Sequence, residues 1–411
     1  MMAVARLATI CLTLLTAPLI ARELGPDGRG LYAACLAAMT FMPSVFGIGI
    51  PMAVRRLVVT ESPAPLVRSA YLLVPILAVP SLASGVAIAH FLIPHLSSIE
   101  RFCFLVGVLV SALFIGTLSV QSVLLVRARY AAVSLLLTVQ TIVVALCTFG
   151  TWALGILNLS WLVASFAAGT AISALLALVL VRVGPIGPRA PLGRLVREGR
   201  RFSVSQLAEV ASATVYPILA VTAVGASGSG YFAVAMTVAG LPIALGHAVG
   251  SIAFREIAVA SEADRQRQAG RYVRVSLQIG IICAVMLAII APTAIPIIFG
   301  EEFRPSISVT LITLLGSSAL LCNYVCNQML AAMGKGLAMT VSQIAGIGVG
   351  VGAMYLLGAY WGANGAAFAV LAAWCVTAVS AVLFLRLRAR DVIPARGDYQ
   401  AMRSILFRGS T

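Results

Sequence analysis

The chain has 411 residues, of which 61% are hydrophobic and only 10% are charged, and its formal net charge is +15. Because an ordinary soluble domain has about 45–50% apolar and about 25% charged residues, this composition excludes a soluble protein and indicates an integral membrane protein. In such a protein the excess of basic residues indicates membrane topology and attraction to anionic lipid, and no binding to nucleic acid is expected.

Apolar runs long enough to cross a bilayer, which takes about 20 residues, recur from one end of the chain to the other. We predict about twelve membrane spans, at residues 4–21, 31–54, 70–95, 103–126, 131–156, 161–181, 203–224, 231–254, 272–298, 307–333, 337–359 and 365–385. The first span has no clear cleavage position, so we expect a retained helix and not a signal peptide. The eight cysteines all fall within the predicted spans, and we expect neither disulfides nor a metal site.

The basic residues predict the orientation of these spans. If both termini are cytoplasmic, 24 of the 28 Lys and Arg residues fall on the inner side. This bias is the one that the positive-inside rule describes. We therefore predict an even number of spans, with the N- and C-termini in the cytoplasm.

The longest polar stretch, "RVGPIGPRAPLGRLVREGRR", lies between the sixth and seventh predicted spans. Pro, Gly and Arg dominate it, which is typical of a linker. The predicted domains are an N-terminal six-helix bundle (1–181), a basic cytoplasmic linker (182–202), a C-terminal six-helix bundle (203–388) and a cytoplasmic tail (389–411).

The two halves resemble each other at a constant offset of 200 residues. Identities with the second half occur at Leu19, Gly25, Gly28, Gly30, Ala33, Ala53 and Arg55. Because each half has an even number of helices, both halves enter the membrane from the same side. Parallel repeats of this kind are a transporter architecture, in which the substrate site lies between the halves.

The stretch "ARELGPDGRGLYA" at 21–33 and its counterpart "VTAVGASGSGYFA" at 221–233 are both rich in glycine. A nucleotide-binding phosphate loop requires a preceding strand and a Lys at fixed spacing, and neither stretch has them. Both lie between two predicted spans, where glycine permits a tight turn with positive φ. We therefore predict structural turns on the outer side.

Three motifs in order resemble one known family. They are "LIARELGPDGRGLYAACLAA" at the first helix hairpin, "IPIIFGEEFRPS" at 295–306 and "WGANGAAFAVLAA" at 361–373. Together they resemble the polysaccharide flippases of the MOP superfamily, which also includes the MATE exporters. The resemblance implies an all-α membrane fold of two six-helix bundles in a V around a central cavity, and a lipid-diphosphate-linked sugar as cargo. The chain begins near its first span and ends soon after its twelfth, which favours the capsule, exopolysaccharide or O-antigen branch over the peptidoglycan-precursor branch.

Three arginines are candidate ligands for an anionic headgroup. Arg55 ends the second predicted span, Arg255 is its counterpart at the end of the eighth, and Arg6 lies in the first. The resemblance to lipid-linked precursor flippases implies that basic residues at this inner end meet the diphosphate, whose oxygens a guanidinium can bind in pairs. The alternative is positive-inside anchoring for Arg55 and Arg255, and snorkelling to the inner headgroups for Arg6.

Polar residues within the spans are the other candidates. Asn323, Asn327 and Gln121 carry amides that could hydrogen-bond sugar hydroxyls, although bonds between helices are the commoner use. Glu209 is the only acidic residue well inside a predicted span. It is a candidate for coupling to H⁺ or Na⁺, and the alternative is an interfacial ion pair with Arg200 or Arg201.

Two prolines occupy almost equivalent positions in the two halves. Pro18 lies in the first predicted span and Pro217 in the seventh. An interior proline removes a backbone hydrogen bond and clashes with the preceding turn. We predict hinges at both positions.

These observations favour a flippase for lipid-linked oligosaccharides that works by alternating access and supplies surface polysaccharide. We expect no enzymatic activity and no cofactor beyond coupling to H⁺ or Na⁺. The expected partners are the lipid-linked cargo, membrane lipids and polysaccharide polymerase or export proteins, and the flippase is expected to work as a monomer. A MATE-type drug or cation antiporter is the alternative. Several acidic residues facing the cavity would favour it, and only Glu209 qualifies. A membrane-embedded polymerase or ligase would need a long outer loop with catalytic groups, and none is visible in the sequence.

Overall fold

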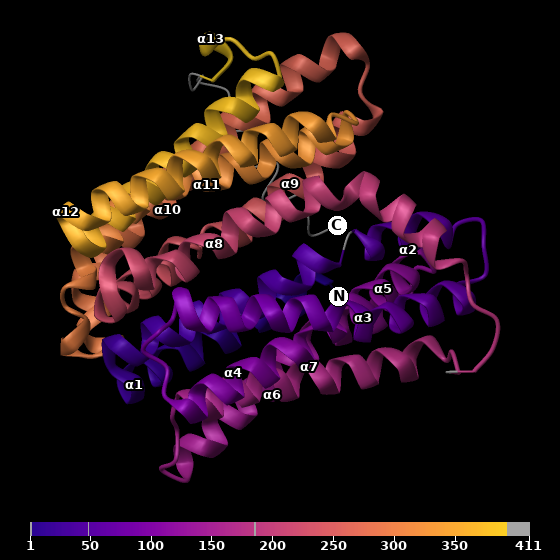
Figure 1. Ribbon diagram of the computed structural model, residues 1–411. Helices are drawn as coiled ribbons and strands as arrows, with labels where there is room; N and C mark the ends of the chain where they lie inside the picture. Colours follow the sequence, from indigo (N-terminus) through magenta and orange to yellow (C-terminus); the bar gives the residue numbers. More distant parts are fainter. Residues whose placement is uncertain (1, 48, 185, 393–411) are drawn as a thin grey trace. The chain divides into compact units, whose positions relative to one another are not determined.

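The computed structural model describes residues 2–47, 49–184 and 186–392, with side chains except at 2–7, 201, 202, 205, 206, 263, 389 and 390. Within these residues the structure is entirely helical and has no strand (Figure 1), which confirms the predicted fold class. The helices are α1 (Met2–Phe46), α2 (Ile50–Leu57), α3 (Pro63–Phe91), α4 (Ser98–Ser111), α5 (Leu113–Val126), α6 (Tyr130–Ala153), α7 (Leu159–Val181), α8 (Leu192–Ala239), α9 (Ile243–Val259), α10 (Glu262–Phe299), the 3₁₀ helix η1 (Glu301–Phe303), α11 (Ser306–Ala332), α12 (Gly336–Phe384) and α13 (Ala389–Val392).

Three of the long helices consist of two segments joined at one glycine. The backbone is non-helical at Gly25 in α1, at Gly225 in α8 and at Gly362 in α12. Nine helices in the described part of the chain are long and apolar enough to cross a membrane, and these three are among them. Counting both segments of each gives twelve, in agreement with the sequence prediction.

The second and eighth predicted spans are interrupted, which the sequence analysis did not predict. Between α1 and α2 the chain passes through Gly49, whose φ of 64° no β-branched residue would tolerate. Between α8 and α9 it passes through Gly240, Leu241 and Pro242. Proline has no backbone N–H to donate to the preceding turn, and its fixed φ suits the start of a helix. Pro242 accordingly stands at the N-cap of α9.

Polar side chains begin several helices. Ser97 accepts a hydrogen bond from the backbone of Glu100 and completes a capping box at α4. Asn158 caps α7 by accepting from Trp161 N at 3.0 Å, and Ser261 caps α10 by accepting from Asp264 N at 3.3 Å. Each cap satisfies a backbone donor that the helix itself leaves open.

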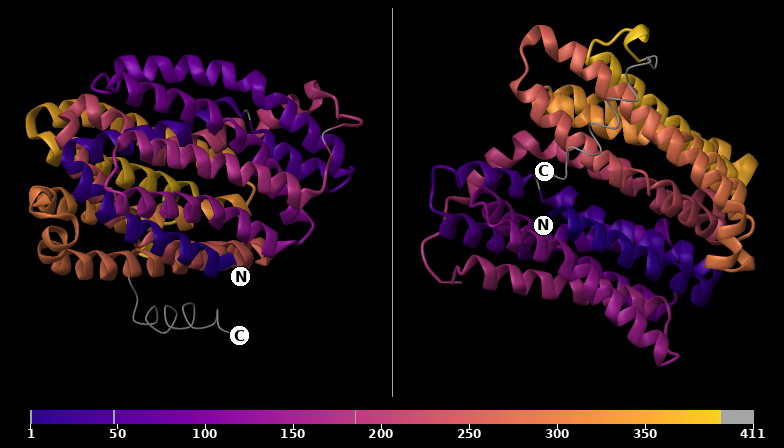
Figure 2. Two further views of the ribbon diagram at one scale, coloured as in Figure 1. Left: turned by 90° about the horizontal axis from the view of Figure 1, so that it is seen from below. Right: turned by 180° about the vertical axis from the view of Figure 1, so that it is seen from behind.

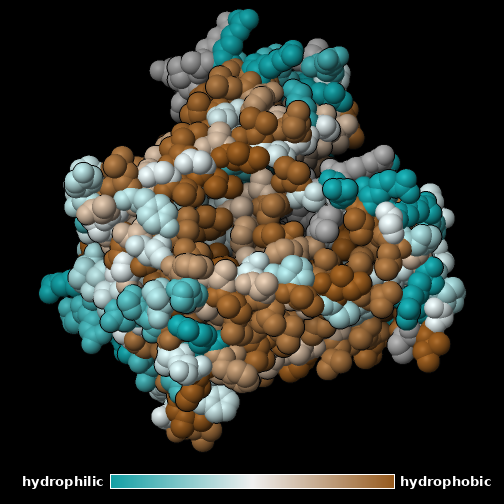
Figure 3. All heavy atoms as spheres, in the orientation of Figure 1, coloured by the Kyte–Doolittle hydropathy of each residue, from teal (hydrophilic) through white to brown (hydrophobic). Residues whose placement is uncertain are grey.

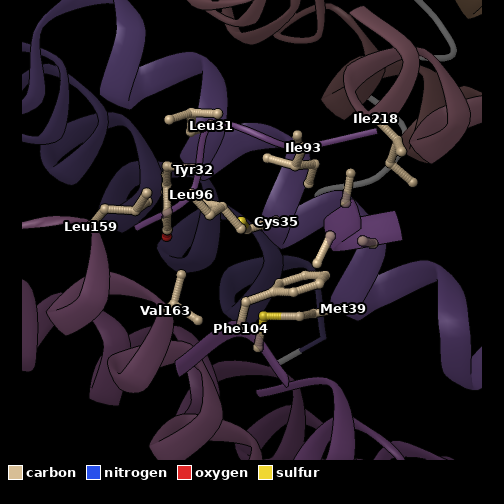
Figure 4. Packing of buried hydrophobic residues seen from close by; sticks show 14 of the residues in the cluster. Leu31, Tyr32, Cys35, Met39, Ile93, Leu96, Phe104, Leu159, Val163 and Ile218 are labelled. Atoms are coloured by element: carbon tan, nitrogen blue, oxygen red, sulfur yellow. The ribbon is translucent and has the colours of Figure 1, made fainter. Parts of the chain in front are cut away.

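The chain forms two compact units, residues 1–222 and 223–411. In the first unit, α1 and α3 to α7 run beside one another (Figures 1 and 2), and α1 packs against α3, α4, α6 and α7. One of its cores gathers apolar residues from α1, α3, α4, α7 and α8, including Met39, Phe104, Val163 and Ile218 (Figure 4). The division predicted from the sequence, around a linker at 182–202, stays a prediction.

In the second unit α11 is the central helix, because it packs against α9, α10 and α12. Its core includes Val249 of α9, Tyr272 of α10, and Leu321 and Val325 of α11. Helix α10 instead exposes a row of large apolar residues, among them Ile281, Val285, Met286 and Ile289. In the view of Figure 3, hydrophobic residues cover much of the molecular surface, as expected for a protein that contacts lipid.

Candidate functional site

The exposed arginines at the end of α2 are placed by the short amphipathic helix that carries them. Its buried side consists of Ile50, Pro51, Ala53, Val54 and Leu57. The opposite side therefore carries Arg55 and Arg56, which are exposed in the last turn, where cations stabilise the helix dipole. A guanidinium in this place can bind an anion without first breaking a buried contact.

The two neighbouring arginines differ in their partners. Arg56 forms an ion pair with Glu198 of α8 at 3.3 Å. Arg55 takes part in no ion pair with any residue that the structure describes. Arg55 thus differs from Arg56 in having no counter-ion among the described residues.

The described residues of the polar stretch at 182–202 contact the C-terminal end of α2 and the N-terminal end of α3. Arg68 donates to the carbonyl oxygen of Gly184 at 2.8 Å and to that of Pro188 at 3.2 Å. Ser69 Oγ donates to Ala190 O at 2.8 Å. Further along, Arg194 pairs with Glu61 at 2.6 Å.

Helix α8 already begins at Leu192, within this stretch, and its residue Leu195 is completely buried in the core of the first unit. Gly199 lies so close to Gly49 that a Cβ on Gly49 would meet its carbonyl oxygen. The described part of the stretch thus packs within the first unit, and its arginines Arg189, Arg197 and Arg200 are exposed.

Arg255 is exposed on α9, one turn before the end of that helix. It corresponds to Arg55 at the repeat offset, and both are exposed cations near the end of the helix that follows an interruption. Arg6 belongs to α1, but its side chain lies outside the described residues. The ligand roles of all three arginines stay predictions.

The amides of α11 form a buried pair. Asn323 and Asn327 are 7% and 8% exposed, and Asn327 Nδ2 donates to Asn323 Oδ1 at 3.2 Å. Among the described residues, Asn327 Oδ1 is a buried acceptor without a hydrogen-bond partner. Gln121 is half-buried on α5. A role for these amides in binding sugar hydroxyls stays a prediction.

Glu209 is exposed on α8, where its carbonyl oxygen accepts from Ser212 Oγ at 2.7 Å. The side chain of Arg201, one of its two predicted partners, lies outside the described residues. Pro18 and Pro217 are half-buried inside α1 and α8, and the non-helical backbone of these helices is at Gly25 and Gly225. The coupling role of Glu209 and the hinge roles of the prolines stay predictions.

The sequence analysis missed a ring contact of a histidine within the predicted spans. His247 of α9 packs against Tyr324 of α11, with ring centroids 4.4 Å apart and an angle of 75° between the rings. A histidine inside an apolar span is a recognisable signal, but only the structure shows which residue it meets. Within the described residues, no group of three or more His, Cys, Asp or Glu residues could hold a metal ion.

The structure is similar to solved transporters along nearly its whole length. A lipid II flippase MurJ in an inward closed conformation has a TM-score of 0.75 and 13% identity, with 99% of both chains covered. An inward-facing multidrug resistance MATE family transporter of the MOP superfamily has a TM-score of 0.67 and 16% identity, with 100% of both chains covered. A MOP superfamily transporter from Pyrococcus furiosus has a TM-score of 0.59 and 13% identity, with 98% of this chain and 94% of that chain covered.

These likenesses show that the chain has the fold of a MOP superfamily transporter. No curated protein sequence matches it. A family model described as "Polysaccharide biosynthesis protein" matches residues 1–245, more than half of the chain. The protein belongs to this polysaccharide biosynthesis family.

Proposed function

We propose that the protein flips a lipid-diphosphate-linked oligosaccharide across the bacterial cytoplasmic membrane by alternating access, for the assembly of surface polysaccharide. The observation that carries the proposal is the family membership over residues 1–245, joined to a transporter fold. The lipid II flippase that the chain resembles supports this class of cargo. Coupling to H⁺ or Na⁺, cytoplasmic termini and cooperation with a polymerase are further parts of the proposal.

Arg55 and Arg255 are the proposed ligands of the diphosphate at the inner side. Both are exposed, and Arg55 forms no ion pair with a described residue, whereas Arg56 is paired with Glu198 at 3.3 Å. A phosphate that leaves bulk water needs compensating charge, and its contact with a guanidinium strengthens as the effective dielectric falls. Asn323, Asn327 and Gln121 are the proposed ligands of the sugar.

The experiment is restoration of surface polysaccharide in a flippase-deficient strain. Because Lys satisfies the positive-inside bias but lacks the planar fork, Arg55→Lys should already reduce restoration, and the double variant Arg55→Glu, Arg255→Glu should abolish it. Arg56→Lys is the matched control, since it keeps the charge beside Glu198 and should restore fully. Full restoration by the double Glu variant, at normal protein level in the membrane, would refute the binding assignment.

A MATE-type antiporter is the second candidate. It is favoured by the similarity to the multidrug resistance transporter, which covers 100% of both chains. Expression in a strain that lacks its drug exporters separates the two functions. Export of cationic drugs without restoration of polysaccharide would establish the antiporter.

A further inference from the structure

A single histidine lies within the eighth predicted span. His247 stands on the second turn of α9, directly after the interruption at Gly240, Leu241 and Pro242. Ionisable side chains at this depth are costly and are functional candidates. Interrupted membrane helices are also the places where transporters form their ion and substrate sites.

The partner of His247 is held in a groove of small residues. Tyr324 meets the imidazole at a centroid distance of 4.4 Å. On either side of His247, Gly246 and Gly250 leave room for the tyrosine ring, because a Cβ on Gly250 would lie 2.9 Å from Tyr324 Cε1 and 3.0 Å from Gln328 Cγ. The two rings are therefore fixed against each other by close contact of α9 with α11.

Helices α9 and α11 carry few charged residues. Helix α11, which carries Tyr324, has no Asp, Glu, Lys or Arg. On α9 itself the charged residues are Arg255 and Glu256, eight and nine positions further on, which is about 12–14 Å along a helix. The remaining titratable and charged groups on the two helices packed against α9 are Cys322 and Cys326 of α11, and Glu262, Asp264, Arg265, Arg267, Arg271, Tyr272, Arg274 and Cys283 of α10.

We propose that His247 is a proton-binding site within the second unit and that its charge controls the packing of α9 against α11. Imidazole is the side chain whose charge changes between about pH 5 and pH 8. The neutral ring packs on Tyr324 as one aromatic on another. The protonated ring is a cation beside the same tyrosine, and a π face attracts a cation more strongly where water is excluded.

Helix α11 also carries an acceptor that suits a protonated state. Asn327 Oδ1 is buried and, within the described residues, has no hydrogen-bond partner. Asn327 is one turn beyond Tyr324 on α11. Tyr324 and Asn327 thus lie on the same helix, the one against which His247 packs.

Proton binding can be measured without any cargo. The chain has three histidines, and His90 and His95 are exposed. In the variant His90→Gln, His95→Gln, the ¹⁵N signals of imidazole come from His247 alone. Titration of these signals between about pH 5 and pH 8 supports the proposal, and a ring that keeps one charge state across this range overturns it. If the double variant fails to fold, the difference between the wild type and His247→Gln gives the same signal.

Variants of Tyr324 test the role of its ring. Tyr324→Phe keeps the π face and should leave proton binding nearly unchanged. Tyr324→Leu removes it, so His247 should bind the proton about threefold more weakly. Equal proton affinity in the Phe and Leu variants would contradict the role of the ring.

The consequence for transport rests on the proposed function. Restoration of polysaccharide should depend on external pH in the wild type and lose this dependence in His247→Gln, while His90→Gln behaves like the wild type. A histidine that titrates in a protein that restores no polysaccharide would refute the flippase and leave the proton site standing. A flippase whose pH dependence survives His247→Gln would refute the control of transport by this site.

Discussion

Gly25 and Gly225 are 200 residues apart and have nearly the same backbone conformation, with φ 64° and ψ −176° at Gly25 and φ 77° and ψ 174° at Gly225. This region of φ and ψ is open to glycine and almost closed to other residues. Each glycine joins two membrane helices without an intervening loop. The repeat seen in the sequence is therefore a repeated turn, as predicted, and it is not a phosphate-binding loop.

A second glycine follows each turn after three residues. A Cβ on Gly28 would lie 2.8 Å from Leu24 Cβ, and one on Gly228 would lie 3.0 Å from Val224 Cγ2. The first glycine reverses the chain, and the second lets the new helix start against the end of the old one.

The same spacing occurs at a third place, in the last hairpin. Gly362 has a φ of 54°, and a Cβ on Gly365 would meet the backbone of Leu357. The chain thus reverses direction between two helices three times with the same pair of glycines, spaced three residues apart.

Alanine at either turn should therefore be strongly destabilising. A residue with a Cβ in this backbone region costs about 1–3 kcal/mol, so Gly25→Ala and Gly225→Ala should each lower the thermal unfolding midpoint in detergent. Gly150→Ala is the control, because Gly150 is helical and a Cβ there would meet no atom within 4 Å. Equal midpoints for the turn variants and the control would show that the turns tolerate a side chain.

The sequence predicted the helix count, the fold class and the loop-free turns because hydrophobic length and glycine are local signals. It did not predict the interruption at Gly47 and Gly49, since the surrounding residues are as apolar as those of a continuous span. The docking of Gly184 and residues 186–200 was also not predicted. The pairing of Glu198 with Arg56 at 3.3 Å joins positions more than a hundred residues apart, and no local pattern encodes such a contact.

The candidate site shows the same limit. Arg55 and Arg255 stand out in the sequence because the repeat aligns them. Their exposure is expected, because each is a charged residue near the end of a helix. The contact of His247 with Tyr324 at 4.4 Å depends on Gly246 and Gly250 facing α11. Their spacing along α9 places the two glycines on either side of the histidine. Only the packing of the helices shows that the aromatic ring beside them is that of Tyr324.

Two glycines of α12 allow the effect of side-chain packing on stability to be distinguished from the effect of helix propensity. A Cβ on Gly346 would collide with Thr377 Oγ1 and lie 2.9 Å from Ala373 O, whereas one on Gly348 would meet nothing within 4 Å. Overpacking costs about 1–3 kcal/mol, while Gly to Ala in an open helix gains up to about 1 kcal/mol. We expect Gly346→Ala to lower thermal stability and Gly348→Ala to preserve or raise it. The reverse order would contradict the close contact between the two segments of α12, one before and one after Gly362.

The attachment of residues 184–200 to α2 and α3 should depend more on its hydrogen bonds than on its ion pairs. Arg56 is 58% exposed in its pair with Glu198, and exposed pairs contribute about 0.2–1 kcal/mol. Ser69 is buried and donates to the carbonyl oxygen of half-buried Ala190 at 2.8 Å, so Ser69→Ala removes a hydrogen bond worth about 0.5–1.5 kcal/mol.

Proteolysis of the 184–200 segment measures this difference. Ser69→Ala should speed cleavage more than Glu198→Gln does, and 0.5 M salt should accelerate the wild type only slightly. Ser122→Ala, at a half-buried serine of α5, is the control for the loss of a hydroxyl. Faster cleavage of Glu198→Gln than of Ser69→Ala would show that the ion pair dominates.

The orientation in the membrane can be tested by labelling single introduced cysteines. The charge bias places Asp27 outside and the 182–202 stretch inside. Gly187 is a poor inner position, because a Cβ there would lie 2.5 Å from Arg68 Nη1 and would disturb its hydrogen bonds. Arg197 is exposed on α8 and takes part in no ion pair with a described residue, so Arg197→Cys is the better probe.

In intact cells, a membrane-impermeant maleimide should therefore label Asp27→Cys above the level of the parent protein, which supplies the background from the native cysteines. Arg197→Cys should stay at that background until the membrane is permeabilised. The physical reason is that moving the arginines of this stretch to the outer side would require many cations to cross the bilayer during insertion, each at a cost of about 2.5–3.5 kcal/mol on insertion scales. If Arg197→Cys were labelled in intact cells and Asp27→Cys only after permeabilisation, the predicted topology would be wrong. Arg55 and Arg255 would then lie on the outer side, where they could not receive cargo from the cytoplasm.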